Sequence, residues 1–393
     1  MKTSKRLLAF ALAVLFALLA VSCSSPDENT GDKSPESAAE TPAETPDETP
    51  ADETPAARTV VDHAGRTVTL PEKIERVVVA DIYPLPSVLA VFFDSAEKLV
   101  GIAAPSMSAA KNSLLGELYP ELLSAETGFI DGTAVNVEEL MKLEPDIVFC
   151  SAGNKECFAA LEQAGIPCVG ISPAKWGYDA VVTLENWIAT LSEIFPENDK
   201  ADIVNAYSEK VYADVQSRVA DIPEEEKARV FFLFQYNNET LTTSGAHFFG
   251  EYWAEAIGAL NVGRELDTDN STAVTMEQVY AWNPSHIFIT NFNAAKPDDL
   301  YNNTIGAYDW SGVDAVTNGR VYKMPLGIYR TYTCGADTPV TLYWLAKCVY
   351  PERFADIDIT AETKSYYKEV FGIELTDEQA NSIFAPVSEA SAF

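Results

Sequence analysis

The chain has 393 residues, and its 59 Asp and Glu against 27 Lys and Arg give a net charge of −32. This charge argues against a nucleic-acid-binding protein or a polybasic membrane-binding face, since both need a positive surface. The length is too great for one ordinary core and suits two domains.

Residues 1–22 have the pattern of an export signal. Lys2, Lys5 and Arg6 precede a short apolar run, which ends in small residues before Cys23. The run is too short for a stable membrane span. Its end resembles the lipobox of bacterial lipoproteins, although Ala20 stands where that motif usually has leucine. We expect a signal peptide at 1–22 and lipidation of Cys23; the alternative is an ordinary secretory signal with an incidental cysteine.

Residues 23–57 repeat Thr, Pro and Glu and have very few apolar side chains. Such a segment cannot bury enough apolar surface to offset the entropy lost on ordering. Because proline keeps a chain extended, we interpret 23–57 as a disordered acidic tether between a lipid anchor and a folded domain.

The next part of the chain alternates strands with helices. A hairpin is expected over Arg58–Leu70, because apolar and polar residues alternate around Ala64-Gly65. Further strands and helices alternate after it, and this order favours a parallel sheet with helices on both faces. The expected strands are 77–80, 100–103, 146–149 and 166–171, and the expected helices begin at Ser87 and cover 136–143 and 156–164.

A long amphipathic helix is predicted over 198–220. Its apolar side chains recur at spacings of three and four residues, with Asp202, Glu209 and Gln216 on the opposite side. Pro196 prevents an earlier helix from continuing, and Asn198 or Asp199 can cap the new one. The buried stripe should be Val204, Tyr207, Val211, Val215 and Val219.

The same scheme follows this helix. Strands are expected at 229–234, 286–290 and 320–324, and helices at 250–259, 277–282, 340–347 and 361–371. The segment Glu138–Asp146 also aligns with Glu277–Ser285, each a short capped helix ended by proline and followed by a strand. We therefore predict two Rossmann-like α/β lobes, 58–197 and 222–393, each a mainly parallel sheet flanked by helices. One linking helix, 198–221, should join them, with a ligand cleft between the lobes.

The cysteines and histidines give no metal-site motif. Beyond Cys23 the cysteines are 150, 157, 168, 334 and 348, without a CxxC or Cys/His cluster, so a zinc site is not expected. Their pairing stays open, and a Cys334–Cys348 bridge is one option in an exported protein. His63 and His286 are expected to be packed. Only His247 is placed to meet a ligand, and one imidazole does not make a site for bare zinc or manganese.

Several segments together resemble one known family. They are RTVVDHAGRTVTLPEKIERVVV, VEELMKLEPDIVF, MEQVYAWNPSHIFI, GRVYKMP and LYWLAKCVYPERF. In order and spacing they are similar to the substrate-binding proteins of ABC importers for iron chelates, haem and cobalamin. These have two lobes bridged by one long helix, and the resemblance covers residues 58–375.

The resemblance implies a function without chemistry. A monomer, lipid-anchored at the outer face of the bacterial cytoplasmic membrane, would capture a ligand between its lobes. It would deliver the ligand to a permease dimer driven by a cytoplasmic ATPase. The ligand would be a ferric siderophore, or alternatively haem or cobalamin, with no resident cofactor. Glu138 and Glu277 occupy the positions at which the family docks on permease arginines; the simpler reading is that each complements a helix dipole.

Ligand-binding residues are expected just beyond the carboxyl ends of the strands. Aromatic side chains suit a large chelate, and an arginine suits an anionic one. His247 and Tyr329 could also touch the metal, while some of the aromatics could simply pack loops onto the sheet. The candidates are Tyr83, Trp176, Tyr178, Gln235, Tyr236, His247, Phe292, Tyr329, Arg330 and Tyr332, together with Ser151–Asn154, Phe248 and Asn293.

Two further classes of protein stay open. The chain has no G-x-S-x-G elbow, Walker loop or GxGxxG after a strand, which argues against an enzyme. A hydrolase or cofactor-assembly activity on a related fold remains possible, as does a surface adhesin or sensor.

Overall fold

The computed structural model describes residues 57–391, so the signal peptide, Cys23 and nearly all of the tether lie outside the described residues. The first sheet has four parallel strands in the order β4-β3-β7-β8. The hairpin expected at Arg58–Leu70 is present as antiparallel β1 and β2. The bounds are β1 Thr59–Val61, β2 Thr67–Thr69, β3 Val77–Val79, β4 Leu99–Ile102, β7 Ile147–Ser151 and β8 Cys168–Ile171.

The second sheet is mixed. Strands β9, β13, β14 and the short β11 are parallel, while β10 and β12 continue the sheet antiparallel in the order β12-β10-β9-β13-β14. The sequence did not reveal β10 or β12, which are rich in Ser and Thr. The bounds are β9 Arg229–Tyr236, β10 Leu241–Ser244, β11 Leu260–Asn261, β12 Ser271–Ala273, β13 His286–Ile289 and β14 Val321–Lys323.

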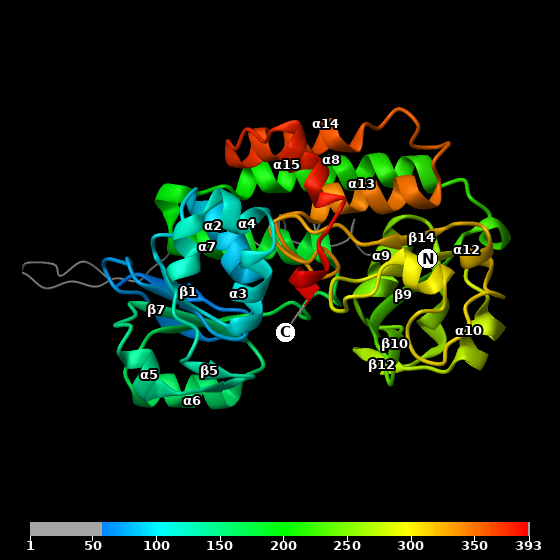
Figure 1. Ribbon diagram of the computed structural model, residues 1–393. Helices are drawn as coiled ribbons and strands as arrows, with labels where there is room; N and C mark the ends of the chain where they lie inside the picture. The colour runs from blue at the N-terminus through cyan, green and yellow to red at the C-terminus, as the bar shows by residue number, and fades with distance from the viewer. Residues whose placement is uncertain (1–56, 392–393) are drawn as a thin grey trace, which may run out of the picture. The chain divides into compact units, whose positions relative to one another are not determined.

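Helices flank both sheets, so the predicted α/β class is confirmed (Figure 1). Those before the long helix are α2 Leu85–Phe93, α3 Ala104–Lys111, α4 Leu114–Leu118, α5 Val137–Met141, α6 Lys155–Gln163 and α7 Ala180–Ile194. Those after it are α9 Phe249–Ala256, α10 Met276–Trp282, α11 Pro297–Tyr301, α12 Asp314–Thr317, α13 Thr338–Val349, α14 Ile359–Tyr366 and α15 Asp377–Ile383.

The long helix, α8, runs unbroken from Ala201 to Val219. It begins slightly later than predicted because residues 196–198 form a 3₁₀ turn. Asp199 accepts a hydrogen bond from the Ala201 amide at 2.9 Å and so satisfies one of the first free N–H groups. All five members of the predicted stripe are buried. Helix α8 packs against α7 and α13 (Figure 1).

Alternate residues of the central strands enter different hydrophobic clusters. Val77 and Val79 of β3 join the largest cluster, whereas Val78 joins a smaller one beneath α6. Phe232 and Phe231 of β9 divide in the same way. This alternation is what a sheet covered on both faces requires. The largest cluster contains side chains of both sheets and of α7, α8 and α13.

Two further findings concern the cysteines and the membrane. Cys150, Cys157, Cys168, Cys334 and Cys348 are free thiols, so the bridge considered between Cys334 and Cys348 is absent. Within residues 57–391, no helix has the length and apolar character needed to cross a membrane.

Candidate functional site

The loops after β3 and β7 are tied together by one carboxylate. Asp81 accepts hydrogen bonds from the Ser151 amide at 2.6 Å and from the Asn154 side chain at 2.8 Å. Tyr83 follows in the same loop and is half-buried, and its carbonyl accepts the Ser106 hydroxyl at 2.8 Å. Burial, with the nearby charge of Asp81, raises the pKa of the Tyr83 phenol.

The loop after β8 carries Trp176 and Tyr178, both half-buried. Trp176 packs edge-on to the His63 ring, with centroids 4.9 Å apart. Tyr178 has a left-handed backbone, with φ of 58°, which is uncommon for an aromatic residue. Its ring lies 5.0 Å from Phe248 and 4.9 Å from Phe249, at the start of α9. The first-sheet loop thus contacts the second-sheet half of the chain through aromatic rings.

A set of rings lies at the carboxyl ends of β9 and β13. Phe234 stacks on Phe292 with centroids 4.9 Å apart and planes at 23°. Tyr332 is fully buried and lies 5.5 Å from Phe234 and 6.1 Å from Phe248. We use the name aromatic cluster for Tyr178, Phe234, Phe248, Phe249, Phe292 and Tyr332.

Arg330 is buried beside this cluster, with only 1% of its surface exposed. Its guanidinium carbon lies 5.0 Å from the Phe292 ring centre and 5.9 Å from that of Tyr329. Burial lowers the pKa of Arg330. The pKa of Tyr329 rises to about 12, mainly through burial, and the charge that Tyr83 would carry pushes it in the same direction. Tyr83 and Tyr329, which lie in loops after strands of different sheets, are therefore close enough for their charges to interact.

Lys323, the last residue of β14, is a site residue that the sequence reasoning missed. Its ammonium donates to the carbonyls of Thr290, Asn293 and Ala295 at 2.9, 2.6 and 3.0 Å. Burial, followed by the charges of Lys296 and Arg330, lowers its pKa to about 7. These bonds hold the loop that carries Phe292. The available signal was a lysine within the strand predicted over 320–324.

The remaining predicted ligand residues lie apart from the cluster. His247 is exposed and pairs with Asp267 at 3.0 Å. Gln235 is exposed near the end of β9, where its backbone N–H donates to the Thr242 hydroxyl. Tyr236 was predicted to contact the ligand, but its side chain is buried in the core. It packs with Phe231 and Leu233 in one hydrophobic cluster, whereas Phe232 belongs to another. Its hydroxyl donates to the Ile305 carbonyl at 3.1 Å, so it is a core residue.

Glu138 and Glu277 occupy equivalent positions in two similar helices. Each is exposed and is the second residue after a side-chain cap, formed by Asn136 for α5 and by Thr275 for α10. The backbone amide of Glu277 and the Thr275 hydroxyl lower the pKa of Glu277. The match in position confirms the repeated local structure and leaves the docking role a prediction.

Three of the cysteines, which form no motif in the sequence, meet in the folded protein. The sulfur atoms of Cys150, Cys157 and Cys168 all lie within 4.8 Å of one another, and all three residues are buried. The spacing along the chain gave no sign of this, because the three residues come from β7, α6 and β8 and meet only in the folded protein.

Comparisons with known proteins agree with this architecture. Residues 90–326 match the family described as periplasmic binding protein. The chain is 27% identical over 341 residues to the molybdate-binding protein MolA of Haemophilus influenzae, covering 80% of this chain and 91% of MolA. A periplasmic solute binding protein of Veillonella parvula has a similar structure, with a TM-score of 0.74, 28% identity and coverage of 83% of this chain and 96% of that one.

A second structure, of Helicobacter pylori CeuE in complex with nickel and histidine, has a TM-score of 0.64. It covers 83% of this chain and 98% of CeuE at 23% identity, so it supports the fold alone.

Proposed function

Because this chain belongs to the periplasmic binding protein family, we propose that it captures an anionic metal chelate, a ferric siderophore in the first instance, and delivers it to an ABC importer. The coarser assignment, an extracytoplasmic solute-binding protein of an ABC transporter, follows from the family and from relatives such as MolA. Relatives that are binding proteins also support a function without catalysis.

The observation that carries the proposal is Arg330, buried against the rings of Phe292 and Tyr329. A guanidinium cation held among aromatic rings can recognise an anion at one side and stack with a planar ligand group at the other. Burial strengthens its interaction with a negative ligand, because little water screens the charge. An anionic chelate with aromatic or flat donor groups fits both features.

The phenols of Tyr83 and Tyr329 add a reason to favour iron. They are electrostatic neighbours, and phenolate oxygen is a donor that holds ferric iron in some proteins. An incoming ferric centre would stabilise their deprotonated forms against the burial that raises their pKa values. A chelate that left one or two iron positions open could be completed by them.

The packing of Tyr178 on Phe248 and Phe249 supports a mechanism in which the ligand enters between the two sheets. The loop after β8 meets α9 through these rings. A ligand that reached Arg330 from this side would replace those contacts with its own surface. Since α8 packs along both α7 and α13, we expect the movement to be small.

A second candidate ligand is an oxyanion, because MolA of H. influenzae is a molybdate-binding protein. Arg330 would serve an oxyanion as well as a chelate. The half-buried rings of Tyr178, Phe234, Phe248 and Phe292 favour a larger ligand, since a small tetrahedral anion would cover little of their exposed surface. Haem and cobalamin, which are also large and carry flat ring systems, are further candidate ligands.

The test is a ligand screen of the full chain by thermal shift and isothermal titration. The probes are catecholate and hydroxamate ferric siderophores, haem, cobalamin and sodium molybdate. A ferric siderophore should raise the melting temperature and titrate at one per chain, since binding to the folded state alone stabilises it. Binding of molybdate with no response to the four chelates would overturn the siderophore assignment and favour the oxyanion.

A further inference from the structure

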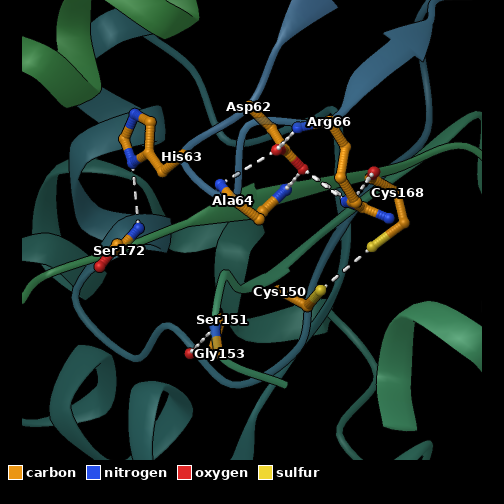
Figure 2. A network of polar contacts seen from close by, with 10 residues as sticks. Asp62, His63, Ala64, Arg66, Cys150, Ser151, Gly153, Cys168 and Ser172 are labelled. Carbon is orange, nitrogen blue, oxygen red and sulfur yellow. Dashed lines mark hydrogen bonds and ion pairs between the residues drawn. The ribbon is translucent and has the colours of Figure 1, made fainter. Parts of the chain in front are cut away.

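Three buried thiols converge on the face of the first sheet that α6 covers. Cys150 belongs to β7, Cys168 to β8 and Cys157 to α6. The sulfur atoms of Cys150 and Cys168 are 3.1 Å apart (Figure 2), and that of Cys157 completes a triangle with no side longer than 4.8 Å. All three residues are buried: Cys150 is 0% exposed, Cys157 2% and Cys168 6%.

A cationic side chain is fixed next to these thiols. Arg66 donates to the Cys168 carbonyl at 2.8 Å and forms an ion pair with the buried Asp62 at 2.7 Å (Figure 2). Its guanidinium also lies 3.5 Å above the centre of the Phe158 ring. The guanidinium thus places a fixed positive charge beside the three sulfur atoms, and such a charge favours the thiolate form of a cysteine.

A hollow in the surface reaches the edge of this group. It has a volume of about 510 Å³. Arg66, Phe158 and Cys168 all line it, so a small ion could approach the sulfur atoms by displacing the Arg66 side chain rather than by opening the sheet. An entry path of this kind is one requirement of a metal site.

The sulfur positions are close to those that thiolate coordination needs. With a zinc–sulfur bond of about 2.3 Å, sulfur atoms around one ion lie roughly 4 Å apart. Rotations of the cysteine side chains could bring the observed triangle to that geometry. Thiolate ligands select soft ions such as zinc and copper(I), and they discriminate against magnesium and calcium.

From this arrangement we propose that Cys150, Cys157 and Cys168 bind one thiophilic metal cation, either zinc(II) or copper(I), at a site distinct from the aromatic cluster. The ion would replace the thiol protons, which would be released to solvent. With three thiolates the site would have a net charge of −1 with zinc(II) or −2 with copper(I), and Arg66 would offset part of it. A bound ion would also connect α6 to two central strands.

The three cysteines lie in a different part of the fold from the candidate solute site. The cysteines belong to the small hydrophobic cluster beneath α6, whereas Phe249 and Tyr332 of the aromatic cluster belong to the largest hydrophobic cluster. The two proposals can therefore fail separately: loss of metal binding would leave the solute assignment untouched, and the reverse holds too.

The experiment uses the full chain, reduced and freed of reductant without exposure to air. It is titrated with zinc(II) or, under nitrogen, with copper(I), and bound metal is counted by native mass spectrometry. We expect one ion per chain, its loss in Cys150→Ser, Cys157→Ser and Cys168→Ser, and its retention in Cys348→Ser, which changes a half-buried thiol outside the group.

Two results would overturn the site. One is no uptake of either ion by the reduced chain, and the other is uptake that survives Cys157→Ser. A mass 2 Da below that of the reduced chain, with no metal bound under any condition, would identify a Cys150–Cys168 disulfide instead. If the serine variants fail to fold, X-ray absorption of the loaded wild type decides the question. A shell of three sulfur atoms at about 2.3 Å supports the zinc site, and a shell of nitrogen and oxygen refutes it.

Discussion

The guanidinium carbon of Arg330 lies 5.0 Å from the centre of the Phe292 ring, and Phe292 sits on a loop that Lys323 holds by three carbonyl contacts. The position of the ring therefore depends on a lysine that need not touch the ligand. Lys323 and Arg330 also repel each other, and this repulsion contributes to the lowered pKa of Lys323.

The first prediction concerns Arg330. In Arg330→Gln the charge is removed and a shorter polar side chain remains. We expect the affinity for an anionic chelate to fall about 10- to 100-fold, since a charge-assisted hydrogen bond contributes roughly 1.5–3 kcal/mol. Isothermal titration measures the change, and Arg353→Gln, at a half-exposed ion pair, serves as the matched control. An unchanged dissociation constant would remove Arg330 from the site.

The second prediction concerns Lys323. In Lys323→Met the stem is retained, but the three carbonyls lose their donor, which costs about 1–3 kcal/mol for each buried group left unsatisfied and not replaced by water. We expect a lower melting temperature and a weaker affinity, because the Phe292 loop is released. Lys296→Met, at an exposed lysine on the same loop, should change neither. Full affinity in a folded Lys323→Met protein would show that the loop keeps its position without the lysine.

The third prediction concerns acid stability. The His63 Nδ1 atom accepts a hydrogen bond from the Ser172 amide at 3.0 Å, so the ring must be neutral at that nitrogen (Figure 2). Burial, followed by the charge of Lys175, lowers the pKa of His63 to about 4, and burial likewise lowers that of His286 to about 4. The unfolded chain, with ordinary histidines near 6.5, binds more protons between these values. The free energy of unfolding should therefore decrease as the pH falls from about 6.5 to 4.

Urea unfolding between pH 4.5 and 7.5 measures this slope. His63→Gln should reduce the slope, His286→Gln should reduce it by a similar amount, and the double variant should reduce it most. A slope identical to that of the wild type in His63→Gln would mean that His63 is protonated equally in both states.

The fourth prediction concerns the two matched glutamates. Glu138→Ala combined with Glu277→Ala should leave the affinity for the ligand unchanged and abolish uptake by cells that carry the importer. The control is Glu193→Ala with Glu225→Ala, which removes the same charge from two exposed positions elsewhere. Cellular uptake of the labelled ligand and isothermal titration together make the test. Weaker binding in the Glu138/Glu277 double variant, or normal uptake, would argue against a docking role.

The long helix shows how much an amphipathic pattern can predict. In α8 the five residues chosen from their spacing are the five large side chains that the structure buries. Helix α7 was not predicted, although it is 15 residues long. Its buried side chains nevertheless follow the helical period, and Glu185, Asn186 and Glu193 fall on the opposite side, so the same pattern could have predicted it.

Some residues of the candidate site could also be predicted from the sequence, and others could not. Arg330, Tyr329 and Phe292 were chosen as candidates because they follow strand ends, a rule that needs only the order of the elements, and the structure places Arg330 against both rings. Tyr236 was misplaced because β9 extends to that residue, so the side chain points to the face fixed by strand alternation. The contacts of Lys323 and the meeting of the three cysteines depend on distances between segments far apart in the chain, which spacing does not encode.

The largest hydrophobic cluster takes side chains from β3 and β7 as well as from β9 and β13. Heating should therefore melt both sheets in one cooperative calorimetric transition, with equal van't Hoff and calorimetric enthalpies. Fragments cut at α8 would each expose apolar surface that normally faces the other half, so neither should remain in solution as a folded piece. The loops around the ligand could then vary in evolution, but the two halves could not be recombined as independently folding domains.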